Sequence, residues 1–240
     1  HSVPYSEISS GGPPPDGIPP IDRPTFETIE AADDWLEDRE PVIALSLGDD
    51  ARAYPLQIMT WHEIVNDTVN GNPVVVTFCP LCNTGLVFER PSFEGTHLTF
   101  GTSGNLRNSD LVMWDRETQS WWQQFTGEAI VGDLTGETLT PIPVTLIAWE
   151  DFKTTYPEGQ VLSRDTGYNR DYGRNPYAGY DNVDSSPFLF DGESDDRLRP
   201  MERVLGFLLP NGENAAYPYP RLQEERVIND QVGEQAIVLF

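Results

Sequence analysis

One stretch, residues 74–89, constrains the fold of this chain more than any other. It reads V-V-V-T-F-C-P-L-C-N-T-G-L-V-F-E and contains both cysteines of the protein, Cys79 and Cys82. A β-branched run precedes the cysteines, a shorter apolar run follows them, and Pro80 and Gly85 lie between the runs. Two strand-like runs joined by a short segment with turn residues are typical of a β-hairpin. The pattern therefore predicts that the Cys-x-x-Cys pair lies at a hairpin tip.

This placement separates two chemistries of a Cys-x-x-Cys pair. A thioredoxin-type pair needs its first thiol at a helix N-terminus, where the helix dipole lowers the thiol pKa. The residues that follow here, Asn83-Thr84-Gly85 and then β-formers, are poor helix formers. A hairpin-tip C-P-x-C instead resembles half of the metal knuckle of rubredoxins and zinc ribbons, in which a tight turn brings two thiolates to one metal. A local disulfide, a redox pair or a reduced buried pair are the alternatives.

A complete metal site needs further ligands, because structural sites usually have four and this chain has no second cysteine pair. His62 is our candidate for the third ligand, since a helix packed beside the hairpin would bring its ring to the thiolates. Met113 is a candidate soft fourth ligand, with a core methionine as the alternative. Cysteine with histidine and methionine favours copper, whereas cysteine with histidine and carboxylate favours zinc. A satisfied helix-end histidine is the alternative for His62.

Other polar residues are weaker candidates. Ser103, Asn105, Asn108 and Asp110 form a polar cluster that would line a pocket, although Asn and Asp in turns are usually structural. Asn66 begins an Asn-Asp-Thr sequence that fits a glycosylation acceptor. The chain has no nucleophile elbow, P-loop or dinucleotide fingerprint. The sequence therefore assigns no catalytic residue.

The net charge is −24, from 39 acidic against 15 basic residues, and Lys153 is the only lysine. Such a surface repels nucleic acid and anionic membranes, which argues against both as partners. An acidic, lysine-poor surface resembles that of a halophilic protein, whose self-repulsion salt screens; an acidic secreted protein from an ordinary source is the alternative. No apolar run approaches the roughly 20 residues that span a bilayer. Because the chain begins at His1, we expect that an export signal has been removed and that the protein is extracellular or at the cell surface.

The order of patterns along the chain predicts three regions. Residues 1–24 are rich in proline and glycine and form an extended tail. Residues 25–200 form a β-rich domain with the Cys-x-x-Cys hairpin, and residues 201–240 begin a second unit packed on the first. Short helices are predicted over 28–38, 56–65 and 149–156, strands over 41–47, 111–114 and 121–125, and an irregular loop over 161–180.

A repeat supports this second unit. Ala53-Tyr54-Pro55 matches Ala216-Tyr217-Pro218, and Val65-Asn66-Asp67 matches Ile228-Asn229-Asp230, at a constant separation of 163 residues (217 − 54 and 230 − 67). The repeat predicts two units of strand, turn, Tyr-Pro, segment, Asn-Asp and strand, the second incomplete. An unpaired apolar strand over 235–240 would be an edge that another chain can join. We therefore expect self-association through the tail and this strand.

The stretch W-H-E-I-V-N-D-T-V-N-G-N-P-V-V-V-T-F-C-P-L-C-N-T-G resembles a bacterial and archaeal family catalogued as domain of unknown function 3179. The resemblance implies an exported protein, often membrane-anchored, and it supplies no established activity. Members usually have glycine after the second cysteine, where this chain has Asn83. Because asparagine tolerates a left-handed backbone, we expect the turn to survive.

These observations predict a mostly β fold, a β-rich α+β arrangement with short helices and a two-unit pseudo-repeat. Three functional hypotheses remain open. The first is a soft-metal binding or electron-transfer protein that holds copper, or else zinc, with Cys79, Cys82 and His62. The second is a structural subunit of an extracellular filament or layer, and the third is a thiol-disulfide enzyme.

Overall fold

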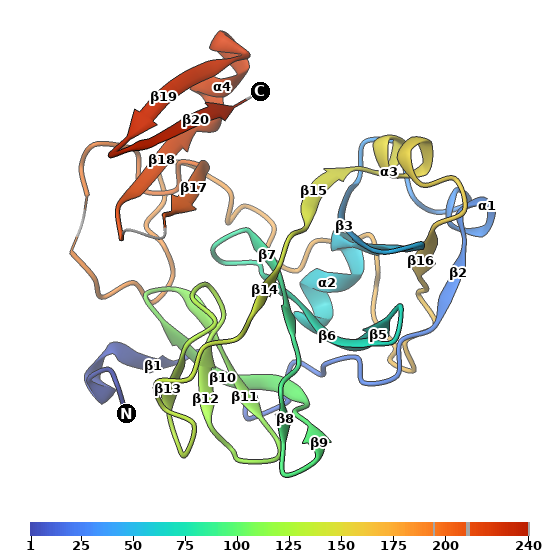
Figure 1. Cartoon of the computed structure of the whole chain (residues 1–240), viewed down its shortest axis with the longest axis horizontal. Helices are drawn as coiled ribbons and strands as arrows, with labels where there is room; N and C mark the ends of the chain where they lie inside the picture. The colour runs from blue at the N-terminus through green and yellow to red at the C-terminus, as the bar shows by residue number, and fades with distance from the viewer. Residues whose placement is uncertain (194, 210–211, 240) are drawn as a thin grey trace. The chain divides into compact units, whose positions relative to one another are not determined.

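The computed structural model describes residues 1–193, 195–209 and 212–239. These residues are mostly β with four short α-helices (Figure 1), which confirms the predicted fold class. The chain divides into two compact units, one of His1–Ala178 with Phe188–Gly192 and one of Gly179–Pro187 with Glu193–Phe240. Phe240, the last residue of the predicted terminal strand, lies outside the described residues. Within the described ranges, no helix has the length and apolar character needed to cross a membrane.

Three sheets of four or five strands build most of the first unit. The first sheet has the strand order β1-β10-β11-β12-β13 and is antiparallel throughout. The second has the order β14-β7-β6-β5, and the third has the order β15-β3-β4-β16-β2, in which only β16 and β4 are parallel. The strands of the first sheet are β1 (Ile8–Ser10), β10 (Phe100–Arg107), β11 (Asp110–Asp115), β12 (Trp121–Gln123) and β13 (Ala129–Val131).

The remaining elements of this unit complete the other two sheets and their covering. The second sheet contains β5 (Ile64–Val69), β6 (Asn72–Cys79), β7 (Thr84–Glu89) and β14 (Pro141–Ile142). The third contains β2 (Phe26–Thr28), β3 (Pro41–Leu47), β4 (Asp50–Pro55), β15 (Thr145–Ala148) and β16 (Gln160–Leu162). The others are η1 (Tyr5–Glu7), α1 (Ile29–Ala32), α2 (Leu56–His62), α3 (Trp149–Thr155) and the hairpin of β8 (Ser92–Phe93) and β9 (Thr96–His97).

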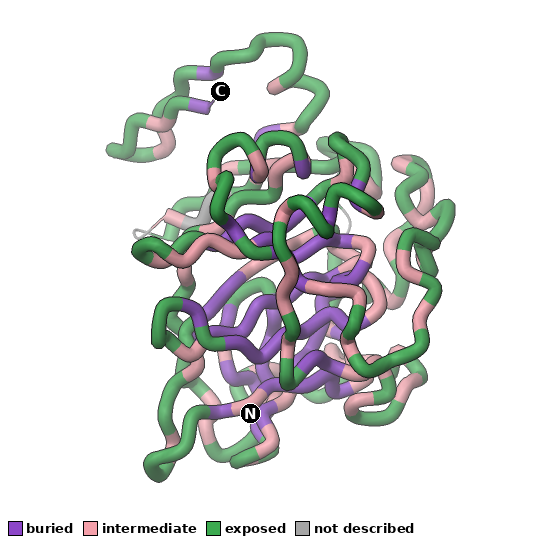
Figure 2. Tube along the Cα trace, turned by 90° about the vertical axis from the view of Figure 1, so that its right-hand side faces the viewer, coloured by how far each residue is buried: buried purple, intermediate pink, exposed green. Residues whose placement is uncertain are grey.

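Strand β6 is the centre of this unit. Val74 and Val76 belong to one buried cluster, whereas Val75 and Cys79 belong to another on the opposite face. Successive side chains of a strand point to opposite faces, so a strand covered on both faces needs apolar residues in an unbroken run. This covering explains why the sequence reads V-V-V rather than alternating apolar and polar residues. Many residues in the strands of this unit are buried, and Figure 2 shows the buried segments of the trace in purple.

Helix α2 ends earlier than the predicted range 56–65. Glu63 has a φ of 60°, a left-handed backbone that ends the helix, and its N–H still donates to Met59 O. Ile64 and Val65 then begin β5, where they pair with β6. The helical spacing of these apolar residues was therefore misread, because each points into one of the two clusters that flank the strand. The helix predicted over 28–38 is likewise only the four residues of α1.

The proline-rich N-terminal segment is held by main-chain hydrogen bonds. Its strand β1 pairs with β10 in the first sheet. Further along, Asp16 N donates to Thr102 O at 2.8 Å, and Ile21 N donates to Ile64 O at 2.9 Å. Ile21 is buried in the same cluster as Val74 and Val76. The segment is thus part of the first unit and contributes to its core.

The second unit consists of a hairpin, a helix and a second hairpin. These elements are β17 (Val204–Leu208), β18 (Asn214–Pro218), α4 (Tyr219–Glu225), β19 (Ile228–Val232) and β20 (Gln235–Leu239). The order matches that of β3, β4, α2, β5 and β6 in the first unit. A shared element order alone does not establish a sequence repeat, so the pseudo-repeat and the packing of this region on the first stay predictions.

Candidate metal centre

Two hairpin turns of the first unit meet at the candidate site. Cys79 ends β6 and pairs with Thr84 of β7, so the residues between them form the predicted hairpin tip. Asn83 in this tip has a φ of 49°, which confirms that asparagine supports the left-handed turn. The second turn joins β10 to β11 through Asn108 and Ser109, which have φ values of 51° and 65°. Two consecutive left-handed residues are typical of a tight two-residue hairpin turn.

The donor atoms of three residues converge between these turns. The Cys79 and Cys82 sulfurs and a carboxylate oxygen of Asp110 lie within 4.8 Å of one another. The Cys82 thiol donates to Asp110 Oδ1 at 3.3 Å, and the Cys79 thiol donates to the carbonyl oxygen of Ser109 at 3.7 Å. Both cysteines are free rather than joined in a disulfide. The arrangement offers two sulfur ligands and one oxygen ligand to a metal ion.

The electrostatics of this group favour a cation. Burial raises the pKa of Asp110 to about 6, although the N–H of Phe125 donates to its carboxylate at 3.0 Å. The hydrogen bond with Cys79, burial, and the negative charges of Cys79 and Asp110 all raise the pKa of Cys82. The thiol of Cys82 and the carboxyl of Asp110 therefore resist ionisation in the metal-free site. A bound metal ion supplies the positive charge that reverses this effect.

His62, the predicted third ligand, is not among the three residues whose donor atoms converge, and ligation by its ring stays a prediction. Its Nδ1 lies 2.7 Å from the carbonyl oxygen of Pro19, and its Nε2 lies 2.6 Å from the hydroxyl of Tyr172. A carbonyl oxygen only accepts, so Nδ1 carries the proton and Nε2 accepts from Tyr172. Burial lowers the pKa of His62 and favours this neutral form. Both nitrogens are thus engaged, and the ring links the N-terminal segment to the loop after β16.

Met113 and the four polar candidates have separate positions. Met113 is fully buried in the apolar cluster that contains Cys79, as a core methionine would be, and ligation by its thioether stays a prediction. Ser103 donates to Val112 O and accepts from the N–H of Asn105, so it holds the irregularity in β10. Asn108 lies in the tight turn. Asp110 is the predicted pocket residue that joins the donor group. The sequence placed it in a pocket and did not identify it as a metal ligand.

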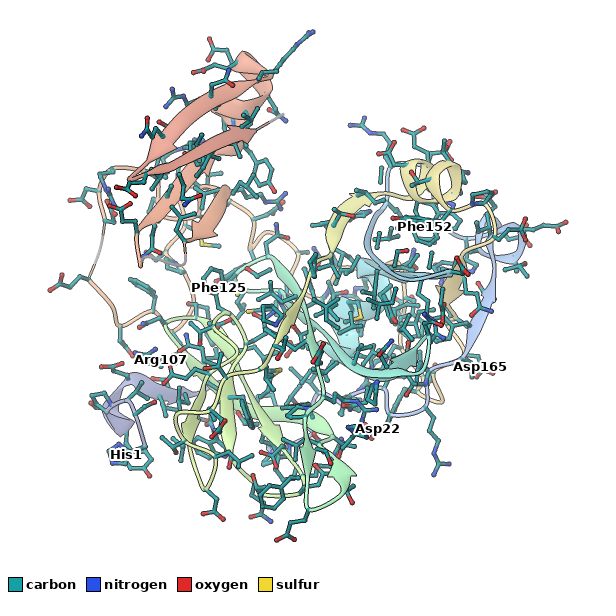
Figure 3. All side chains as sticks on the ribbon, viewed as in Figure 1. His1, Asp22, Arg107, Phe125, Phe152 and Asp165 are labelled. Atoms are coloured by element: carbon teal, nitrogen blue, oxygen red, sulfur yellow. The ribbon has the colours of Figure 1, made fainter. Side chains whose placement is uncertain are left out.

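Asn66 is also different from its predicted role. It is buried, and its side-chain nitrogen donates to Asp22 Oδ1 and to Phe100 O, both at 2.8 Å. The label at Asp22 in Figure 3 marks this part of the unit. A glycan on the same nitrogen would break at least one of these hydrogen bonds. The sequence match at Asn66 therefore does not correspond to an accessible acceptor.

A second buried carboxyl lies close to the thiols. Glu63 is 5% exposed, and burial raises the pKa of its carboxyl to about 7. Tyr177 donates to Glu63 Oε1 at 3.0 Å, and the charge of Cys79 contributes to the raised pKa of Tyr177. Sequence reasoning did not single out Glu63, which lay within the helix predicted over 56–65. Its burial follows from the left-handed end of α2, for which no local sequence signal is evident.

The chain matches the family described as "Protein of unknown function (DUF3179)" over residues 15–240, nearly its whole length, and belongs to that family. No curated protein and no solved structure matches the chain.

Proposed function

We propose that this chain, as a member of the DUF3179 family, binds a metal ion between Cys79, Cys82 and Asp110. The observation that carries the proposal is the convergence of three donor atoms from two hairpins within 4.8 Å. Around a tetrahedral ion with bonds near 2.0–2.3 Å, donor atoms lie roughly 3.5–3.8 Å apart. Small rotations of the three side chains therefore bring them to bonding distance without a change of fold.

The donor set favours zinc over copper. The expectation of copper depended on His62 and Met113, and the nitrogens of His62 are occupied by Pro19 and Tyr172. Two thiolates with a carboxylate are ligands that zinc accepts in proteins, whereas copper is favoured by thiolate together with imidazole or thioether. Zinc is therefore our proposal, and copper is the competing outcome that the experiment distinguishes.

A thiol-disulfide enzyme is less well supported by the same geometry. Such an enzyme needs a thiolate at neutral pH, and the neighbours of Cys82 raise its pKa instead of lowering it. The thiols also follow a strand rather than begin a helix. Without a cation, this environment suppresses the nucleophile that disulfide exchange requires.

Metal analysis of purified protein tests the proposal. The reduced protein is dialysed against zinc or copper(I), freed of excess metal, and analysed for metal and for accessible thiols. We expect about one zinc per chain and protection of both thiols, as for a site with two thiolate ligands. Cys82→Ser and Asp110→Asn should lose the metal, whereas Asp133→Asn, which changes an exposed carboxylate, should keep it. Wild-type protein that binds neither metal, or that binds copper in preference to zinc, would contradict the proposal.

Export to the cell surface and self-association through the chain ends also stay proposals. Export is supported by the family resemblance and by the acidic composition. A metal site with thiolate ligands protects its cysteines in an oxidising compartment, which is compatible with an exported protein.

A further inference from the structure

Gln124 lies where the two hairpins of the candidate centre are tied together. It follows β12, its own N–H donates to Leu111 O at 2.9 Å, and the N–H of the next residue, Phe125, donates to Asp110 Oδ2. Figure 3 labels Phe125 and so marks this position. The side-chain nitrogen of Gln124 reaches the other hairpin, where it donates to Thr77 Oγ1 at 2.9 Å and to Thr84 O at 3.2 Å.

These partners fix the orientation of the amide. The carbonyl oxygen of Thr84 only accepts, and the hydroxyl of Thr77 already donates its proton to Leu86 O at 2.9 Å. Both partners therefore need the amide nitrogen of Gln124. A flipped amide would place its oxygen against two acceptors, so the nitrogen and oxygen positions are determined by the hydrogen bonds.

The oxygen of this amide is left without a donor. Gln124 is fully buried, and its Oε1 has no hydrogen-bond partner in the part of the chain that the structure describes. A buried acceptor without a partner costs about 1–3 kcal/mol, and such groups are rare in native proteins. A purely structural role would be filled by the two bonds from the nitrogen, and it leaves the oxygen unexplained.

We propose that the side-chain oxygen of Gln124 is the fourth donor of the metal centre. This inference rests on the proposed function. Three protein ligands leave one position of a tetrahedral zinc ion open. The residue connects the strands that carry Asp110 and Cys79, and an amide oxygen adds no charge. With two thiolates and one carboxylate around a divalent ion, the net charge is already −1, so a neutral fourth ligand is favoured over another anion in a buried site.

The test compares Gln124→Leu with Thr77→Val. The leucine variant removes the oxygen and the nitrogen together, whereas the valine variant removes one partner of the nitrogen and leaves the oxygen in place. The zinc dissociation constant is measured by competition with a chromophoric chelator, the coordination by the visible spectrum of the cobalt(II) form, and the stability of the metal-free protein by thermal unfolding.

We expect Gln124→Leu to weaken zinc binding by at least about 10-fold, because loss of even a group that only hydrogen-bonds to a metal ligand costs about 10- to 100-fold. The variant should also change the cobalt spectrum. Thr77→Val removes one of the two bonds that orient the amide and leaves its oxygen in place, so it should weaken zinc binding less than Gln124→Leu and keep the wild-type cobalt spectrum. If Gln124→Leu does not fold, Gln124→Ala, which also offers no donor atom to the metal, is measured in its place.

A Gln124 variant with wild-type zinc affinity and cobalt spectrum would overturn the inference and leave the proposed function intact, provided that Cys82→Ser still loses the metal. If the wild-type protein binds no zinc, both the inference on Gln124 and the proposed function are overturned. Equal loss of affinity in Gln124→Leu and Thr77→Val would show that the residue acts through the packing of the two hairpins, and it would also overturn the inference.

Discussion

The hairpin, helix and hairpin of β3 to β6 and those of β17 to β20 share local details. In the first, the Tyr54 hydroxyl donates to Asp67 Oδ2 at 2.6 Å; in the second, the Tyr217 hydroxyl donates to Asp230 Oδ2 at 3.0 Å. Both aspartates also accept from the N–H of the following residue at 2.7 Å. Each helix is followed by a residue with a φ of 60°, Glu63 and Arg226.

The surroundings of the two regions differ. β5 and β6 lie in a four-stranded sheet with β7 and β14, whereas β19 and β20 form a sheet of two strands. Glu63 is buried and Arg226 is exposed. Only the first region leads into a hairpin that carries thiols. The comparison teaches that the local frame is common to both regions, and that the candidate site depends on the strands added around one of them.

The largest expected effect is that zinc stabilises the first region and not the second. Zinc at about 1,000 times its dissociation constant should raise the free energy of unfolding by about 4 kcal/mol, because it binds the folded state alone. We expect a rise in the melting temperature of the first unit, which tryptophan fluorescence reports because all six tryptophans of the chain lie within residues 1–178. Cys82→Ser should not respond. An equal zinc response in the variant would show that the metal binds elsewhere.

A smaller effect concerns pH. The pKa of Glu63 is about 7 in the folded protein and near 4.5 in an unfolded chain, so the folded state binds this proton more tightly. In the metal-free protein, Glu63 should therefore make its full contribution to the free energy of unfolding below about pH 4.5. This contribution, about 3 kcal/mol, is lost as the pH rises to 7. Asp110 acts in the same direction, with its folded pKa at about 6.

Chemical unfolding of wild type and Glu63→Gln from pH 4 to pH 8 measures the effect of Glu63 as the difference between the two curves. The matched variant in the other region, Arg226→Gln, should follow the wild-type curve because its side chain is exposed. A stability difference between wild type and Glu63→Gln that is the same at both ends of the range would contradict the assigned cause.

The smallest effect compares the two tyrosines. Tyr54→Phe removes a buried hydrogen bond to a carboxylate and should destabilise the first unit by about 2 kcal/mol. Tyr217→Phe should cost less than Tyr54→Phe, because Asp230 is exposed to water that replaces the lost donor. Urea unfolding of both variants provides the measurement. Equal costs would mean that the two regions are more alike than their burial indicates.

Much of the fold follows from local patterns. The strand predicted over 41–47 is β3 with the same bounds, and the runs around the cysteines form the β6–β7 hairpin. The errors occur where one pattern has two interpretations. The apolar residues Ile64 and Val65 continue the helical spacing of α2, but they alternate between the two faces of β5. The positive φ of Glu63 decides between a longer helix and a strand, and the spacing of apolar residues does not predict it.

The sequence predicted only part of the candidate site, because only part of it is formed by residues that are close together in the chain. The thiols are adjacent in sequence, so the hairpin pattern alone places both at one turn. Asp110 is 28 residues from Cys82, and its approach depends on the alignment of two separate hairpins. Histidine was chosen as a ligand by residue type. In the structure, Nδ1 of His62 bonds with Pro19 O and Nε2 bonds with the Tyr172 hydroxyl. No sequence spacing indicates that these residues meet.

The sequence by itself determined the β-rich class, the hairpin with its two thiols and the left-handed tolerance of Asn83, because each depends on interactions between near neighbours in the chain. The tertiary structure decided which carboxylate meets the thiols, which way the amide of Gln124 faces, and that Glu63 is buried. These features arise from contacts between strands that are distant in sequence. The burial that raises the pKa values of Glu63 and Asp110 exists only when the sheets have packed together.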